Sequence, residues 1–373
     1  MSNRIPGLDL LRSMAIGLVM VQHQALFFIV TQQTWIPRWL TTGPFGVDLF
    51  FVLSGFLIGG ILLDIGDRLQ GPRVVSGFWF SRWLRTLPNY YLFLGVNIAI
   101  WFGLGIPPTP WRTILWYPFF FQNIVHHIDR FYVESWSLCV EEWFYLFFPL
   151  MLCVGMNLGV RFNRVYMAAV AVLIFVPIIL RTTMPAPHDW GLDVNMVVFH
   201  KFDALGLGVA TVYAVRAWPS LWRRLATPAA AGGLALVAEC YVYSCRSNLT
   251  ASFFARSLYP TIESFGWALL LPWAAQCGTL GGGWFERSTA AVARWSYSLY
   301  LTNFVISVLL TDFLQPRIQG IAAGVIVCEV LFLSISLSMS AALYRWVELP
   351  FLRMRLRIPI CVEARPARAR QLA

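Results

Sequence analysis

The stretch LDLLRSMAIGLVMVQHQALFFIV, residues 8–30, decides the fold class, because as a helix it is long enough to cross a membrane core of about 30 Å. It contains Arg12 and His23, eleven residues apart. At about 100° per residue these two side chains share one helix face and lie about 16 Å apart along the axis. Ionisable groups inside a span are costly and mark functional sites, and histidine exchanges protons near neutral pH. The alternatives are that Arg12 extends back to the membrane surface and that His23 only bonds a neighbouring backbone group.

The composition places the whole chain in a membrane. Of the 373 residues, 58% are apolar and 12% charged, and the mean hydropathy is +0.65. A soluble protein cannot bury so much apolar surface with so few charges on its exterior. The net charge of +10 does not indicate nucleic acid, because the basic residues lie at the ends of apolar stretches and form no single patch. The seven cysteines have no metal-ligand spacing, so we expect no metal site.

The apolar windows predict an all-α bundle of about ten transmembrane helices. We place the spans near residues 8–30, 44–64, 86–105, 138–158, 165–182, 199–217, 227–247, 258–276, 295–314 and 321–344. With the N-terminus inside, inner segments hold nineteen arginines and outer segments seven, which is the positive-inside pattern. An even number of spans then puts both termini in the cytoplasm. We expect residues 1–349 to form one transmembrane domain and residues 350–373 a basic, disordered tail near anionic lipid.

The outer connection at residues 106–136 is rich in proline and aromatic residues, as in PPTPW and WYPFFFQN. It is too apolar for a solvated loop. We therefore expect it to lie in the membrane interface or to fold back into the protein.

A carboxylate stands near the outer end of the second span, GPFGVDLFFVLSGFLIGG (residues 43–60), at a depth similar to that of His23. This residue, Asp48, would fix the tautomer of the imidazole and stabilise its charged form. The alternative is that Asp48 only caps the helix start.

Arginines gather where the stretch FWFSRWLRTLPNYY (residues 78–91) meets the membrane. Arg82 and Arg85 share a helix face, and Arg73 lies just upstream. Guanidinium groups at the mouth of a bundle suit the phosphates of a nucleotide-like ligand. The positive-inside rule alone would also place arginines here.

Acidic residues mark the start of the fourth span, ESWSLCVEEWFYLFFPL (residues 134–150). The helix dipole favours an acid in the first turn, but it does not account for Glu141, which lies inside the apolar run. In the sixth span, we expect Lys201, the only lysine, to be neutralised by Asp203.

Six of these stretches, in order, resemble the acyltransferase 3 family of bacterial integral-membrane acyltransferases, over most of the chain. They are RIPGLDLLRSMAIGLVMVQH, GPFGVDLFFVLSGFLI, FWFSRWLRTLPNYYL, ESWSLCVEEWFYLFFPL, HKFDALGLG and ARWSYSLYLTNF.

The resemblance implies roles for particular residues. It makes His23 the catalytic histidine with Arg12 as its partner, assigns the donor to Arg82 and Arg85, and makes Glu141 the acid of the Trp-Ser-Leu motif. From the same motifs we expect the substrate to contact Trp136, Ser137, Tyr297 and Asn303. The chain departs from the family at Asn303, where the usual residue is histidine. Asparagine keeps hydrogen bonding but cannot take a proton, so His23 must carry more of the acid–base work.

We therefore predict a multi-pass O-acyltransferase of the bacterial inner membrane, surrounded by lipid. It would move an acyl group, by resemblance acetyl, from cytoplasmic acetyl-CoA to a hydroxyl of a saccharide or glycolipid, such as O-antigen or exopolysaccharide. His23 acts as general base or carries the acyl group transiently. Two alternatives remain open: a proton-coupled transporter or flippase that uses His23, Arg12 and Glu141 as a relay, and a membrane anchor for a polysaccharide-assembly complex.

Overall fold

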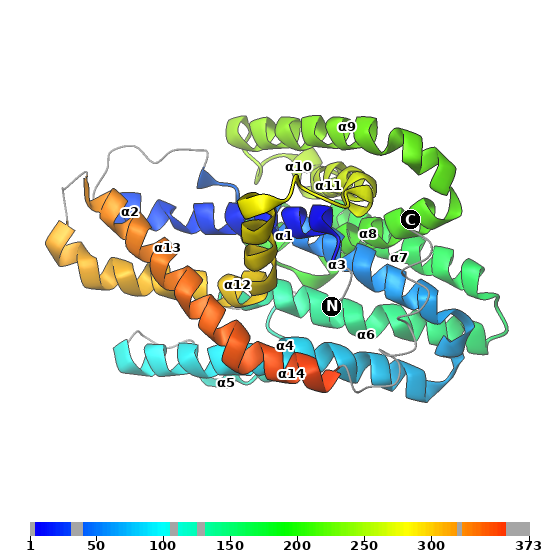
Figure 1. Cartoon of the computed structure of the whole chain (residues 1–373), viewed down its shortest axis with the longest axis horizontal. Helices are drawn as coiled ribbons and strands as arrows, with labels where there is room; N and C mark the ends of the chain where they lie inside the picture. Colours follow the sequence, from blue (N-terminus) through cyan, green and yellow to red (C-terminus); the bar gives the residue numbers. More distant parts are fainter. Residues whose placement is uncertain (1–3, 31–39, 105–110, 125–130, 319–322, 356–373) are drawn as a thin grey trace.

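The computed structural model describes residues 4–30, 40–104, 111–124, 131–318 and 323–355, and within these ranges the chain is helical, with no strand. The α-helices are α1 (Pro6–His23), α2 (Ala25–Val30), α3 (Gly43–Ile65), α4 (Pro72–Leu104), α5 (Trp111–Ile114), α6 (Ser135–Asn157), α7 (Phe162–Thr183), α8 (Phe202–Ala217), α9 (Pro219–Arg246), α10 (Phe253–Ser257), α11 (Tyr259–Gln276), α12 (Gly283–Ile318), α13 (Ala323–Leu343) and α14 (Leu349–Arg355). The short helical turns are η2 (Gly66–Gln70), η3 (Tyr117–Phe119), η4 (Gly191–Asn195), η5 (Val198–His200) and η6 (Tyr344–Glu348). In Figure 1, α9 runs along one edge and α4 with α14 along the opposite edge, with α1 and α3 between them.

The predicted all-α membrane bundle is confirmed. Among the described residues, seven helices are long and apolar enough to cross a membrane. Each of the ten predicted spans coincides with a helix, and the three outside those seven are α4, α8 and α11. Of these, α8 is only 16 residues long, which is short for an independent span.

The ends of the helices meet in the order that alternating spans require. Lys201, before α8, pairs with Asp48 in the second turn of α3, and Arg216 at the end of α8 pairs with Asp64 at the end of α3. Helices α3 and α8 are therefore parallel. At the same end of the bundle as Asp64, the side chain of Asn157 in α6 donates to the carbonyl of Gln70. The ends predicted to share a membrane side thus lie together; which side is cytoplasmic stays a prediction.

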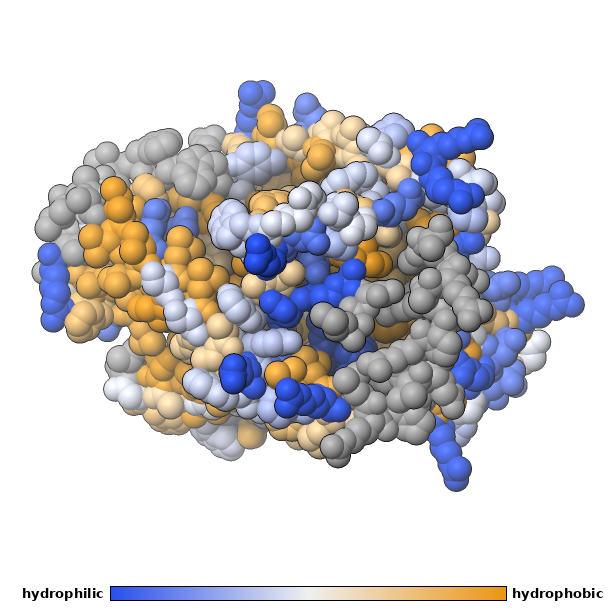
Figure 2. Space-filling model, in the orientation of Figure 1, coloured by the Kyte–Doolittle hydropathy of each residue, from blue (hydrophilic) through white to orange (hydrophobic). Residues whose placement is uncertain are grey.

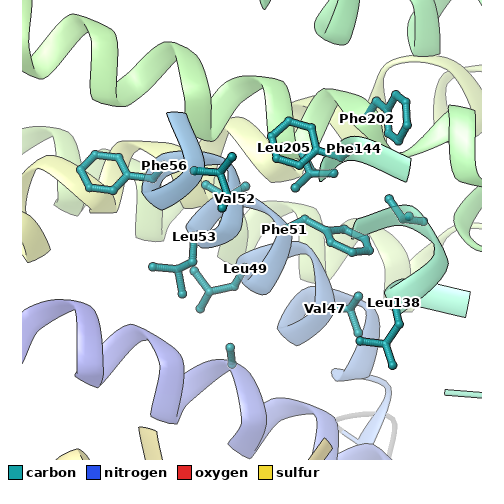
Figure 3. Close-up of a cluster of buried hydrophobic side chains, with 14 of the residues drawn as sticks. Val47, Leu49, Phe51, Val52, Leu53, Phe56, Leu138, Phe144, Phe202 and Leu205 are labelled. Atoms are coloured by element: carbon teal, nitrogen blue, oxygen red, sulfur yellow. The ribbon is translucent and has the colours of Figure 1, made fainter. Parts of the chain in front are cut away.

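Helix α3 forms the centre of the bundle, and most of its residues are buried. Figure 3 shows its apolar side chains among those of α6 and α8. Close contact depends on two glycines: a Cβ on Gly55 would lie 2.0 Å from the carbonyl oxygen of Leu205, and one on Gly208 would lie 2.1 Å from that of Val52. Glycine lets two membrane helices approach backbone to backbone.

The 106–136 connection folds back into the protein in part, one of the two outcomes that its apolar sequence predicts, whereas Trp111 and Phe119 are 65% and 69% exposed. The carbonyl of Phe120 accepts hydrogen bonds from the Cys139 thiol and the Trp143 indole of α6. The hydroxyl of Tyr90 in α4 donates to the carbonyl of Tyr117. Residues 105–110 and 125–130 of this connection lie outside the described residues.

Hydrophobic side chains cover much of the visible face, above all at the left of Figure 2 over α12 and α13, whereas hydrophilic side chains project at the right end. Phe313 of α12 and Ile326 of α13 are 61% and 64% exposed, which suits a surface that faces lipid.

The first residues of the predicted tail are helical, because α14 continues past residue 349, and Arg355 donates to the Ser81 hydroxyl. The rest of the predicted tail, residues 356–373, lies outside the described part of the chain.

Candidate active site

His23 is the last residue of α1, and the structure pairs it with Asn303 of α12. Its Nδ1 bonds the side-chain oxygen of Asn303, and its ring meets the edge of Phe304 with the ring centroids 5.1 Å apart. The Asn303 amide nitrogen donates to the carbonyls of Leu299 and Tyr300, both at 2.8 Å. Asn303 is fully buried, so this contact is part of the packed interior.

A second group, the charge cluster, consists of Arg12 of α1, Arg85 of α4 and Glu141 of α6. Both guanidinium groups lie close enough to the Glu141 carboxylate to interact with it electrostatically. The carboxylate itself accepts hydrogen bonds from Ser54, at 2.5 Å, and Tyr145, at 2.9 Å. Within the described part of the chain, neither guanidinium is held by a hydrogen bond or ion pair. Two arginines are thus available to a ligand beside one positioned carboxylate.

Tyr297 links α12 to α4 beside the charge cluster. Its hydroxyl donates to the carbonyl of Thr86 at 2.6 Å, and the Thr86 hydroxyl donates to Glu142 at 2.6 Å. Since Tyr297 and Asn303 lie on one helix, α12 connects the arginines of α4 with the histidine of α1.

Glu348 is a residue that our sequence reasoning missed. It ends the π-helical turn η6, is 5% exposed, accepts a hydrogen bond from Ser298 at 3.1 Å and lies within electrostatic range of Arg85. π-helical turns occur frequently at functional sites. The available signal was an acid in the apolar stretch RWVELPF, followed two residues later by proline.

The three arginines predicted to bind the donor differ in their surroundings. Arg82 is 5% exposed, its guanidinium lies 5.8 Å from the centroid of the Phe78 ring, and its Nε has no hydrogen-bond partner among the described residues. Arg85 belongs to the charge cluster one turn later. Arg73, in the first turn of α4, is exposed. The structure therefore separates the exposed Arg73 from the buried Arg82 and the half-buried Arg85.

Ser137 and Trp136 join α6 to its neighbours. The Ser137 hydroxyl lies 2.6 Å from that of Tyr300, which in turn donates to the carbonyl of Glu134. The Trp136 ring packs edge-on against Phe51 of α3. Tyr300 thus connects Ser137 with Asn303, because the Tyr300 carbonyl accepts a hydrogen bond from the Asn303 amide. Trp136 packs in the core.

The predicted pairing of Asp48 with His23 is wrong, as is that of Lys201 with Asp203. The ammonium of Lys201 lies 2.6 Å from one Asp48 carboxylate oxygen, and Asp203 bonds Arg181 at 2.7 Å. All four side chains are at most 2% exposed. A buried ammonium needs a carboxylate, whereas a neutral imidazole does not, so the charged groups pair with each other. The signal was Arg181, a charge near the end of an apolar helix that required an acid.

Glu134 precedes α6 and lies outside the spanning helix. It is 4% exposed, and neither carboxylate oxygen has a hydrogen-bond partner among the described residues. Burial raises the pKa of Glu134 to about 8, because the charged form loses its hydration.

Comparison with known proteins adds a family and two named relatives. A family model described as an acyltransferase domain matches residues 5–344. The chain is 33% identical over 166 residues to peptidoglycan O-acetyltransferase OatA of Listeria monocytogenes, covering 40% of this chain and 24% of that protein. It is 33% identical over 188 residues to putative peptidoglycan O-acetyltransferase YrhL of Bacillus subtilis, covering 46% and 27%. The match thus spans about a quarter of the length of these relatives. No solved structure matches the chain.

Proposed function

The chain belongs to the acyltransferase 3 family, and from this membership we propose that it transfers an acetyl group from acetyl-CoA to a hydroxyl of a saccharide or glycolipid. The observation that carries the proposal is His23, which ends α1 within the candidate span Pro6–Phe28 and has one ring nitrogen bonded to Asn303. The other ring nitrogen is then free to take the proton of an acceptor.

The donor would bind through Arg82 and Arg85. Guanidinium groups bind phosphate oxygens in pairs of parallel hydrogen bonds. In support, the Arg85 guanidinium forms no hydrogen bond or ion pair within the described residues, and the Nε of Arg82 has no hydrogen-bond partner there. Arg12 of the charge cluster lies about 16 Å from His23 along α1. The extended pantetheine arm of acyl-CoA is the part of the donor that would span this separation.

In the proposed reaction, the free nitrogen of His23 removes the proton of the acceptor hydroxyl. The hydroxyl oxygen attacks the thioester carbonyl, the carbon–sulfur bond breaks, and the CoA thiolate takes the proton back from the imidazolium. Such general-base catalysis contributes typically about 10²–10⁴-fold. Glu141 positions the arginines of the charge cluster and takes no proton from substrate in this scheme.

The acceptor class is supported by the names of the two relatives, both of which refer to peptidoglycan. We propose a saccharide acceptor, with peptidoglycan the first to test and O-antigen or exopolysaccharide next. We also propose that the chain lies in the cytoplasmic (inner) membrane, where acyl-CoA is supplied from the cytoplasm.

The test uses purified protein in proteoliposomes with radiolabelled acetyl-CoA and a soluble peptidoglycan fragment. Free CoA and labelled glycan should both appear only when donor and acceptor are present together. If label crosses the membrane without release of CoA, the chain is a transporter and the proposal fails. Wild-type rates with His23→Ala would contradict the role of His23, and no transfer by the purified wild-type protein would leave the chain as a membrane anchor.

A further inference from the structure

We infer that Asn303 is a positioning residue that holds His23 in the tautomer with its proton on Nδ1, so that Nε2 is the reacting nitrogen. The inference rests on the proposed function for its catalytic meaning, because it names the atom of His23 that meets the acceptor. It concerns the position at which this chain carries asparagine in place of the usual histidine.

The orientation of the Asn303 amide is fixed by its own helix. Its nitrogen contacts two backbone carbonyls, those of Leu299 and Tyr300, each at 2.8 Å. A carbonyl only accepts hydrogen bonds, so the amide nitrogen with its two hydrogens must face this side. The amide cannot be turned over without losing both bonds, and the oxygen is therefore the atom that faces His23.

The orientation of the amide determines the tautomer of the imidazole. The Asn303 oxygen only accepts, so the Nδ1 in contact with it must be the donor. In a neutral imidazole one nitrogen carries the proton and the other a lone pair. With the proton on Nδ1, the lone pair of His23 lies on Nε2.

The surroundings of His23 add no competing charge. Around the ring, the described residues offer the Asn303 amide and the Phe304 ring, while the side-chain oxygen of the neighbouring Gln22 accepts from the Gly43 backbone. Among the described residues, no charged side chain lies within electrostatic range of His23. Hydrogen bonding to Asn303 is thus the interaction that selects the tautomer.

Neighbouring residues hold Asn303 in place on α12. Tyr300 attaches one turn of α12 to α6 through Ser137 and the Glu134 carbonyl. The Thr302 hydroxyl, 3.1 Å from that of Ser340, attaches the same turn to α13. A positioning group held on a rigid helix keeps its partner within the narrow range of geometry that catalysis needs.

The test measures the tautomer directly and separately from activity. Protein labelled with ¹⁵N-histidine in detergent, with His23 assigned by comparison with His23→Gln, should show a protonated Nδ1 and an unprotonated Nε2. In Asn303→Leu, which cannot accept, the Nε2-protonated form should appear and kcat should fall about 10–100-fold, the loss typical of groups that orient a metal-binding histidine. The donor KM should change less than about twofold. Ser296→Ala removes a buried hydrogen bond to the Ala293 carbonyl elsewhere on α12 and is the matched control, with wild-type tautomer and rate.

Asn303→Asp gives a second readout that a merely structural role would not move. A carboxylate still accepts from Nδ1 but also stabilises the imidazolium, so the acidic limb of kcat/KM should move to higher pH. Wild-type His23 protonated on Nε2, or Asn303→Leu with unchanged tautomer and kcat, would overturn the inference. If the expected tautomer is found but the wild type releases no CoA, the proposed function fails and the positioning stands. If Asn303→Leu does not fold, the wild-type spectrum and the Asn303→Asp profile still decide.

Discussion

The ammonium group of Lys201 contacts both carboxylate oxygens of Asp48, at 2.6 and 2.8 Å, and so joins the start of α8 to α3. Both residues are 1% exposed. His23 instead meets a neutral amide. The ionisable groups inside the bundle therefore include fully buried pairs that hold helices together and the half-buried charge cluster, whose arginines are available to a ligand.

The first prediction concerns this pair. Asp48→Asn should lower the free energy of unfolding by about 3–5 kcal/mol, because it leaves a buried ammonium without its partner. Asp48→Leu combined with Lys201→Met should recover most of that loss, since no unpaired charge remains. Unfolding in detergent, followed by fluorescence, measures both. If the single variant is as stable as wild type, the pair does not hold α3 and α8 together.

The second prediction concerns His23. His23→Ala should reduce acetyl transfer at least about 100-fold, the lower range of general-base effects, while the protein still inserts and accumulates. The control is His188→Ala, an exposed histidine outside the site. Transfer rates in proteoliposomes at equal protein amounts give the result. More than about a tenth of wild-type activity in His23→Ala would exclude the general-base role.

The third prediction concerns the donor. Arg82→Ala with Arg85→Ala should weaken acetyl-CoA binding about 10–100-fold, the equivalent of losing a charged hydrogen bond of about 1.5–3 kcal/mol, and should change acceptor binding less. Arg73→Ala should have a smaller effect, because that side chain is exposed. Arg164→Ala, an exposed arginine on α7, controls for net charge. Separate titrations of donor and acceptor measure the two affinities. An unchanged donor affinity would mean that these arginines serve only the orientation of the chain in the membrane.

The fourth prediction concerns pH and Glu134. Burial raises the pKa of Glu134 to about 8 in the folded protein, from 4.5. The stability that its protonated form provides is therefore complete below about pH 4.5 and is lost as the pH rises towards about 8. Glu134→Gln, which cannot ionise, should gain in Tm relative to wild type as the pH increases from 5 to 8. Asp67→Asn removes an exposed carboxylate and is the control. A Tm difference independent of pH would refute this account.

The positions of the helices could be predicted from sequence because long apolar windows are decided by the membrane and not by particular partners. The membrane also makes a buried charge conspicuous, so Arg12, His23 and Glu141 stood out before any contact was known. Partners could not be predicted in the same way. Asp48 and His23 were expected at one depth, but depth does not say which helix faces which, and Asp48 faces α8.

Glu348 was missed for a related reason. It lies just before a basic, polar tail, so the sequence predicts a charge at the membrane surface and not a buried one. Only the packing of the turn η6 against α12 and α4 reveals that its carboxylate is buried beside Ser298. The link between Asn303 and His23 also depended on packing, although the unusual residue at position 303 had already drawn attention to it.

The reciprocal glycine contacts of α3 and α8 restrict how the protein can move. Each glycine receives the backbone carbonyl of the opposite helix, at Leu205 and Val52, so neither helix can slide along the other without a steric clash. The ion pairs near the two ends, Asp48–Lys201 and Asp64–Arg216, oppose rotation and splaying. Helices α3 and α8 therefore form one rigid unit. An opening that admits a long substrate to His23 therefore comes from the displacement of other helices, such as α1 or α12, against this pair.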